Sequence, residues 1–195
     1  MKETLDYYNQ NADAFIAGTQ NADMSEQYRF FLKHLAPGGK LLDLGCGSGR
    51  DSAYFASLGF VVTAVDGSEE LCKRVNENYG IEALCMRFED IAFHAEFDAI
   101  WACASLLHVK KADIPNIMKK VSASLKPGGV LYASFKYGSD ERISGGRFFN
   151  NYTERDLGSL LTEETQLTLL EYRITRDVRP ERAGERWLNF TAKKK

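Results

Sequence analysis

The chain has 195 residues, of which 44% are hydrophobic and 27% are charged, and its formal net charge is -2 at pH 7. This composition is typical of one globular domain over residues 1–195 and gives no electrostatic reason to bind nucleic acid or an anionic membrane. No apolar run reaches the roughly 18 residues of a membrane-spanning helix, and the N-terminus lacks the apolar stretch of a secretory signal.

The cysteines indicate a reducing compartment. Cys46, Cys72, Cys85 and Cys103 are spread singly, with no C-x-x-C pair among them. This spacing argues against a zinc site and against a disulfide framework. We therefore expect a cytoplasmic protein that holds no metal.

The first 36 residues predict a helical segment. Residues 4–35 show aromatic and apolar side chains at helical spacing, which predicts two helices. Ordinary packing against a core would also account for this spacing.

Strands alternate with helices from residue 40 onward. Short apolar or β-branched runs predict five strands, at 40–44, 61–66, 83–88, 97–104 and 130–136. Helices are expected between them, and this alternation predicts a parallel sheet covered on both faces. The final runs, at 168–178 and 186–192, are too close in sequence for a crossover helix and predict an antiparallel hairpin in a core spanning residues 37–195.

A glycine-rich loop follows the first strand. In "LLDLGCGSGRD", Gly45 and Gly47 leave room for a ligand to approach the backbone, and Cys46 lies between them. Asp66 ends the next strand, 21 residues after Gly45, where its carboxylate can accept from two ribose hydroxyls. The two features together predict a site for a ligand that contains a ribose.

The details of the loop disfavour a dinucleotide. Arg50 stands where G-x-G-x-x-G has its last glycine, and Asp43 lies two residues before the first one. A carboxylate at Asp43 would repel a pyrophosphate but could pair with an ammonium or a sulfonium. The loop thus favours a cationic, phosphate-free ligand such as S-adenosylmethionine over NAD.

Four segments resemble one family in order and spacing. They are "LLDLGCGSGRDSAYFA", "VVTAVDGSEEL", "FDAIWACASLLHV" and "SLKPGGVLYASFK". Together they resemble the class I S-adenosylmethionine-dependent methyltransferases, and the chain is most similar to the small, single-domain, tellurite-resistance type. The resemblance implies an α/β, Rossmann-like, seven-stranded sheet in the order 3-2-1-4-5-7-6, mostly parallel with one antiparallel strand and with helices on both faces.

The resemblance also implies roles for individual residues. Gly45 and Gly47 would line the methionine part of S-adenosylmethionine, with Asp43 near its amino group, and Asp66 would hold the ribose. The adenine would lie near Gly67, Ser68 and Phe88, with Glu89 or Asp90 accepting from its amino group, although Phe88 could equally belong to the core. Ala104 and Ser105 would border the methyl group. The segment "YYNQNADAF" resembles the lid that covers the cofactor in many small-molecule methyltransferases, so residues 1–36 would form a helical lid with Tyr8 as its contact, the alternative being plain packing.

Two sets of side chains are candidates for acting on an acceptor. His108 follows the fourth strand and could be a general base, or could brace the next segment. Arg147 and Arg179 lie in arginine-rich segments and could hold an anionic acceptor, or could belong to a solvated, mixed-charge surface.

The predicted function is methyl transfer from S-adenosylmethionine to a small-molecule acceptor, which would be anionic if Arg147 and Arg179 bind it. The alternative is a protein that binds the cofactor for sensing or as a scaffold and catalyses nothing. No basic domain or aromatic groove indicates a nucleic-acid substrate.

Overall fold

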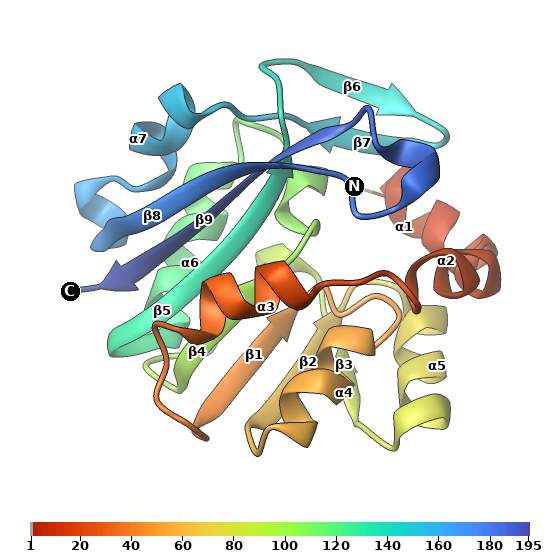
Figure 1. The fold of residues 1–195 in the computed structure, drawn as a ribbon, viewed down its shortest axis with the longest axis horizontal. Helices are drawn as coiled ribbons and strands as arrows, with labels where there is room; N and C mark the ends of the chain where they lie inside the picture. Colours follow the sequence, from red (N-terminus) through yellow and green to blue (C-terminus); the bar gives the residue numbers. More distant parts are fainter. Residues whose placement is uncertain (1) are drawn as a thin grey trace.

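A computed structural model describes residues 2–195 (Figure 1). Residue 1, where the predicted lid and domain begin, lies outside the described residues. Seven strands form one sheet in the order β3-β2-β1-β4-β5-β9-β8. Their bounds are β1 Lys40–Leu44, β2 Val61–Asp66, β3 Ala83–Cys85, β4 Phe97–Ala102, β5 Leu125–Lys136, β8 Leu167–Arg176 and β9 Arg186–Lys194.

The direction of each strand matches the predicted topology. Strands β1 to β5 pair in parallel, whereas β9 runs antiparallel to both β5 and β8. Strand β8 therefore points the same way as β1 to β5, and β9 is the one antiparallel strand. The predicted fold class and strand order are confirmed.

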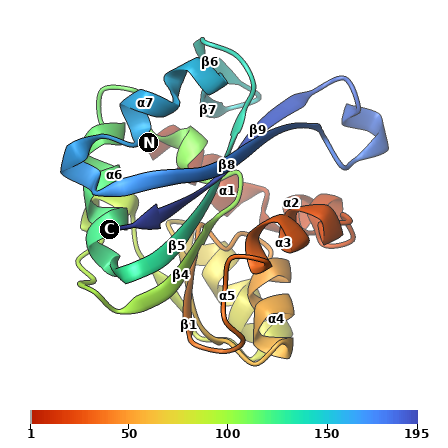
Figure 2. The same ribbon diagram turned by 60° about the vertical axis from the view of Figure 1, so that its left-hand side comes forward.

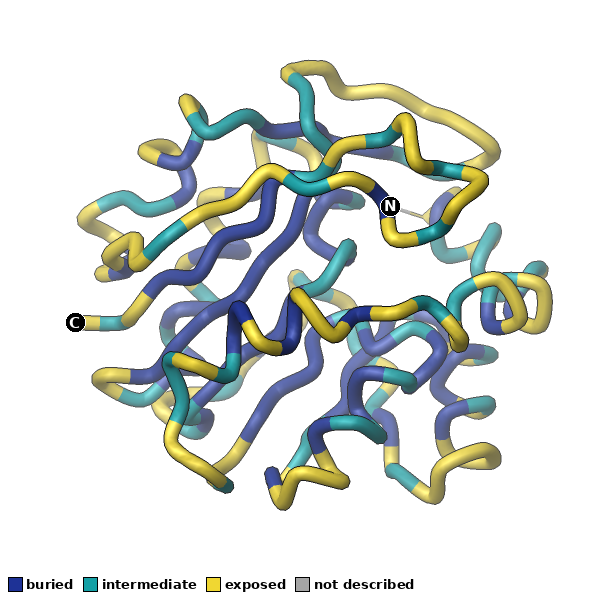
Figure 3. The backbone as a smooth tube through the Cα atoms, viewed as in Figure 1, coloured by how far each residue is buried: buried dark blue, intermediate teal, exposed yellow. Residues whose placement is uncertain are grey.

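Helices cover both faces of the sheet, as the apolar strands require. Helices α3 (Ser25–Leu32), α4 (Arg50–Ser57) and α5 (Glu69–Tyr79) lie on one face, and α6 (Ile114–Ser124) and α7 (Leu157–Leu160) lie on the other (Figure 1). In Figure 3 the central strands are buried along most of their length, while β8 at the sheet edge is mostly exposed.

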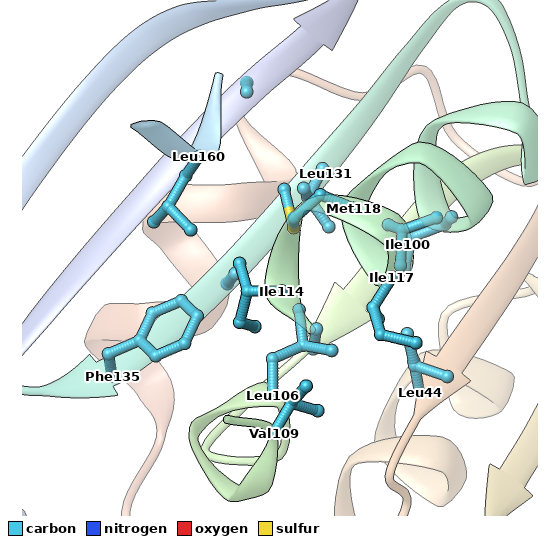
Figure 4. Close-up of a cluster of buried hydrophobic side chains, with 14 of the residues drawn as sticks. Leu44, Ile100, Leu106, Val109, Ile114, Ile117, Met118, Leu131, Phe135 and Leu160 are labelled. Atoms are coloured by element: carbon cyan, nitrogen blue, oxygen red, sulfur yellow. The ribbon is translucent and has the colours of Figure 1, made fainter. Parts of the chain in front are cut away.

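The largest core cluster lies between the sheet and α6. Figure 4 shows Ile114, Ile117 and Met118 of α6 pointing toward Ile100 and Leu131 of the strands. These side chains are buried at the i, i+3, i+4 spacing of one helix face, so the same pattern that predicts the helix also forms the core. This rigid layer fixes the strand ends from which the site is built.

The N-terminal segment contains three helices, where two are predicted. They are α1 (Lys2–Gln10), α2 (Ala12–Thr19) and α3. Helices α1 and α2 are separated by Asn11, whose φ of -121° is not helical and whose side chain donates to the Tyr7 carbonyl oxygen at 2.8 Å. Helix α3 buries Tyr28 and Phe31 against the aromatic cluster on the sheet, so only α1 and α2 remain as candidates for the lid.

Two further features were not identified from the sequence. The glycine-rich stretch after β5 is a hairpin of β6 (Glu141–Ser144) and β7 (Arg147–Asn150). Strand β5 begins at Leu125 and contains an irregularity in its pairing with β4, between the pairs Phe97–Leu125 and Ala99–Val130. Within residues 2–195, no helix is both long and apolar enough to cross a bilayer.

Candidate active site

A cavity of about 200 Å³ opens at the carboxyl ends of the parallel strands. The residues around it come from α1 and α2, the glycine loop, the ends of β2 and β4, β7, and the β8–β9 hairpin. Of the predicted site residues, those that line the cavity are Tyr8, Gly45, Cys46, Gly47, Asp66, Gly67, Phe88, Ala104, Ser105, His108, Arg147 and Arg179. Asp43, Ser68, Glu89 and Asp90 are not part of the lining.

The glycine loop lies against the end of β4. Gly45 has φ +84°, and a Cβ added to it would stand 2.3 Å from the Cβ of Ser105. The loop is held because the amides of Gly45 and Cys46 both donate to the Val65 carbonyl oxygen, at 2.8 and 2.9 Å. Only glycine has both the conformation and the space at position 45.

Asp66 joins the glycine loop to the start of α5. Its Oδ2 accepts from the Gly47 amide and its Oδ1 from the Ser68 amide, each at 2.9 Å. Burial raises the pKa of Asp66, and the backbone amides partly oppose that rise. Each oxygen retains further acceptor capacity, so the carboxylate can bind a ligand while it holds the loop.

Asp43 lies beneath the loop rather than in the cavity lining. It is buried and accepts from the Ser52 hydroxyl at 2.6 Å. Burial, together with the nearby Asp51, raises the pKa of Asp43 to about 8. Its predicted role beside the cofactor's amino group stays a prediction.

A buried ion pair next to the loop was not identified from the sequence. Arg50 donates to Asp51 through Nε at 2.6 Å and through Nη2 at 3.0 Å. Asp51 also accepts from the Tyr28 hydroxyl and the Trp101 indole, while Arg50 donates to the Thr19 carbonyl oxygen at 2.9 Å. The pair therefore ties α2 to the cofactor end of the sheet. Neighbouring Arg and Asp residues are too common to reveal this from sequence.

Tyr8 and His108 form a hydrogen-bonded pair between α1 and η2 (Leu106–His108). The Tyr8 hydroxyl lies 2.9 Å from His108 Nε2, and His108 Nδ1 lies 2.6 Å from the Phe148 carbonyl oxygen. Because a carbonyl can only accept, Nδ1 carries the proton and Nε2 accepts from Tyr8. Burial lowers the pKa of His108 to about 4, so the ring is neutral at pH 7.

The residues predicted to border the methyl group and the adenine lie at the ends of β4 and β3. Ala104 has φ +51°, an uncommon conformation for a residue with a side chain, and the Ser134 hydroxyl accepts from its amide at 2.8 Å. Phe88 is half-buried in the cavity wall, beside Arg87, whereas Glu89 and Asp90 are exposed on η1 (Phe88–Asp90).

The two predicted acceptor-binding arginines have different surroundings. Arg179 makes a two-pronged pair with Asp177, at 2.9 Å from Nε and 2.7 Å from Nη2. The guanidinium of Arg147 instead lies over aromatic rings, 4.7 Å from the centre of Tyr7 and 5.2 Å from that of Phe149. Among the described residues, no group of three or more His, Cys, Asp or Glu side chains could hold a metal ion.

Comparisons with known proteins agree with this geometry. Residues 41–129 match a family described as a methyltransferase domain. The ubiquinone biosynthesis O-methyltransferase of Xanthomonas campestris pv. campestris (strain B100) is 35% identical over 105 residues, which are 50% of this chain and 43% of that protein. The chain spans less than half the length of the curated relatives it matches.

Solved structures extend the similarity to nearly the whole chain. The Burkholderia thailandensis 1,6-didemethyltoxoflavin-N1-methyltransferase, solved with 1,6-didemethyltoxoflavin and S-adenosylhomocysteine bound, has a TM-score of 0.77 at 25% identity and covers 97% of this chain and 84% of its own. TehB from Haemophilus influenzae, of the tellurite-resistance type, has a TM-score of 0.70 at 22% identity. The match covers 95% of this chain and 67% of the TehB chain.

The sheet order and the loop position define the fold of the class I S-adenosylmethionine-dependent methyltransferases. Residues 41–129, just under half of the chain, match the methyltransferase-domain family model. The resemblance predicted from the sequence is confirmed.

Proposed function

We propose that the protein transfers the methyl group of S-adenosylmethionine to a small-molecule acceptor. The observation that carries this proposal is the placement of the glycine loop and the Asp66 carboxylate on one cavity, at the carboxyl end of a class I methyltransferase sheet. Ligands bind at this edge in open α/β sheets.

The residues present fit the cofactor. A Cβ at Gly47 would stand 3.1 Å from the Phe15 ring, and one at Gly67 would stand 2.8 Å from Leu5, so both glycines keep space between the loop and the N-terminal helices. Asp66 would hold the ribose hydroxyls, and Phe88 would pack on the adenine. When bound, S-adenosylmethionine supplies a methyl group already activated on a sulfonium.

The protein's own contribution would be orientation and exclusion of water. Tyr8 and Phe15 line the cavity from α1 and α2, and their rings meet edge to face at 5.1 Å. The two helices would act as the lid over the cofactor. Holding the acceptor in line with the methyl group is the main barrier-lowering effect available to such a site.

The acceptor would be anionic and would bind Arg147. This guanidinium lines the cavity and has its Nε buried without a hydrogen-bond partner. Arg179 would act indirectly, by ordering the β8–β9 hairpin through Asp177. The Nε2 atom of His108 accepts from the Tyr8 hydroxyl, so His108 would orient that phenol. It would accept a proton from the acceptor only if the acceptor replaced Tyr8 as the hydrogen-bond partner of Nε2.

Calorimetry and a methyl-transfer assay test the proposal. We expect micromolar binding of S-adenosylhomocysteine, much weaker binding of NADH, and transfer of labelled methyl to a member of a panel of small organic acids and metalloid oxyanions. Equal affinity for NADH and S-adenosylhomocysteine would overturn the cofactor assignment. Tight cofactor binding without turnover on any acceptor would favour the sensing or scaffold alternative.

A further inference from the structure

The cavity is far more cationic than the chain that forms it. Seven cationic side chains line it, and only three carboxylates do, although the whole chain has a formal charge of -2. The cations are Arg50, Arg87, Lys136, Arg147, Arg176, Arg179 and Arg182, and the carboxylates are Asp51, Asp66 and Asp177. S-adenosylmethionine has one carboxylate against a sulfonium and an ammonium, so it adds no net negative charge to the cavity.

Three of these cations are neutralised within the protein. Arg50 pairs with Asp51, Arg179 pairs with Asp177, and Lys136 pairs with Glu185. A fourth, Arg87, is exposed beside the adenine edge. The three that remain are Arg147 on β7 and Arg176 and Arg182 on the β8–β9 hairpin, and none has a carboxylate within 4.0 Å among residues 2–195.

Arg147 is held in position without being neutralised. Its guanidinium stacks over Tyr7, Tyr8 and Phe149, with centroid distances of 4.7, 5.8 and 5.2 Å. Aromatic faces attract a cation but leave its N–H groups free to donate. Because Nε is buried and lacks a partner, an anion inside the cavity would satisfy it.

The hairpin arginines are unpaired because their neighbouring carboxylates are already engaged. Asp177 accepts from Arg179 and from the Trp187 indole, at 2.7 and 3.0 Å through Oδ2. Glu185 is engaged by Lys136, and the exposed Glu181 is not part of the cavity lining. Arg176 also lies directly across from Arg186 in the β8–β9 register. Like charges at such a position repel and destabilise a sheet, and an anion bound at Arg176 would relieve that repulsion.

The two cationic positions are on different elements. The β8–β9 hairpin, which includes η5 (Pro180–Arg182), projects from the end of the sheet where α1, α2 and β7 also lie (Figures 1 and 2). Arg147 lies deeper, where its charge acts on His108, whereas Arg176 is exposed and Arg182 half-buried. One compact anion at Arg147 would leave the hairpin arginines without a counter-charge.

We propose that the acceptor carries two separated anionic groups, one bound by Arg147 beside the methyl edge and one bound by Arg176 and Arg182 at the hairpin. The proposal rests on the proposed function, since it names the acceptor class of the same site. An extended dicarboxylate, or a molecule with a carboxylate and a distant phosphate, has this chemistry. A compact oxyanion does not.

The test compares acids of matched length. Dicarboxylates from malonate to suberate are titrated calorimetrically into the protein saturated with S-adenosylhomocysteine, alongside the monocarboxylates of the same chain lengths and sulfate as a compact dianion. We expect one dicarboxylate length to bind about tenfold more tightly than its monocarboxylate, the scale of a charge-assisted hydrogen bond. Equal affinities across the series, or no binding of any dicarboxylate, would overturn the proposal, as would sulfate binding as tightly as the best dicarboxylate.

Variants separate the two positions. In the double variant Arg176→Gln with Arg182→Gln, the affinity for the best dicarboxylate should fall to that for the monocarboxylate of the same length. Arg147→Gln should lower the affinity for both acids. Arg142→Gln is the matched control, because Arg142 is exposed on β6, pairs with Asp140 and is outside the cavity lining. If Arg142→Gln weakens the dicarboxylate as much as the double variant does, the effect is general surface charge and the proposal fails.

The same titrations distinguish this proposal from the proposed function. If S-adenosylhomocysteine does not bind, the methyl-transfer proposal fails, and the acid series on the free protein still reports on the two anion positions. If S-adenosylhomocysteine binds and the acid series shows no length preference, only the dianionic acceptor is rejected.

Discussion

The two parts of the cavity, one proposed for the cofactor and one for the acceptor, satisfy their polar groups in opposite ways. In the first part, Asp66 accepts from the amides of Gly47 and Ser68, and Arg50 is neutralised by Asp51. In the second part, Arg147, Arg176 and Arg182 lack such partners. The first region is complete before a ligand arrives, whereas the second is left to be completed by the acceptor.

The most disruptive change to the cofactor side should be Gly45→Ala. The new Cβ would stand 2.3 Å from Ser105 Cβ at φ +84°, so we expect a loss of about 3 kcal/mol in the free energy of unfolding, from overpacking and backbone strain together. S-adenosylhomocysteine binding should be lost as well. Urea unfolding and calorimetry measure the two effects.

Gly59→Ala is the control for that change. Gly59 has a similar φ of +88°, but nothing lies within 4 Å of its added Cβ. Only conformational strain should remain, about 1 kcal/mol, with cofactor affinity unchanged. Equal losses for the two variants would show that close contact with Ser105 is not what requires glycine.

The pH dependence of stability should report His108, at the junction of the two sides. Its folded pKa of about 4 lies below the ordinary value of 6.5, so the unfolded chain binds the proton more readily between these values. Stability should therefore be full above about pH 6.5 and fall as the pH decreases toward 4, by about 3 kcal/mol for this group. The measurement is urea unfolding from pH 4 to 8.

His108→Asn isolates this contribution, since asparagine does not titrate. The difference in unfolding free energy between the parent and the variant should shrink as the pH falls. A difference that stays constant over the range would mean that His108 titrates normally and is not buried as described.

Asp66→Ala should weaken cofactor binding. We expect S-adenosylhomocysteine affinity to fall by about 1.5–3 kcal/mol, because charge-assisted hydrogen bonds to the ribose are lost. The Gly47 and Ser68 amides also lose their acceptor, so urea unfolding accompanies the calorimetry. Glu82→Ala, at an exposed residue outside the cavity lining, is the control. Unchanged affinity would reduce Asp66 to an anchor of the loop amides.

The arginines should show the smallest and most selective effects. Arg147→Gln should raise the acceptor's KM about tenfold and leave S-adenosylhomocysteine affinity within about twofold, and Arg147→Lys should recover only part of the loss because lysine lacks the planar fork. Arg179→Gln should change KM less, since Arg179 already pairs with Asp177. Equal effects at the two positions would contradict the division between a direct and an indirect role.

Local patterns in the sequence determined the scaffold. Alternating apolar strands and helices predict the sheet, and the Gly45 loop with Asp66 predicts a ribose-containing ligand, because these signals depend on residues close together in the chain. The class of protein was predicted from the resemblance of four segments in order and spacing. The prediction of two N-terminal helices was wrong, since one non-helical residue, Asn11, separates α1 from α2 and carries little weight in a periodicity count. Residues 141–150 were not recognised as a hairpin, because their glycines indicate turns but do not specify pairing.

Tertiary structure decided which charges are paired. Arg147 and Arg179 are equivalent in the sequence, yet one lies over aromatic rings contributed by α1 and β7 and the other is neutralised by Asp177. The Tyr8–His108 bond joins residues 100 positions apart, and the strained Ala104 backbone has no sequence signature. Partners that are distant in the chain and the burial they create set the electrostatics of this cavity, and neither can be read from residue order alone.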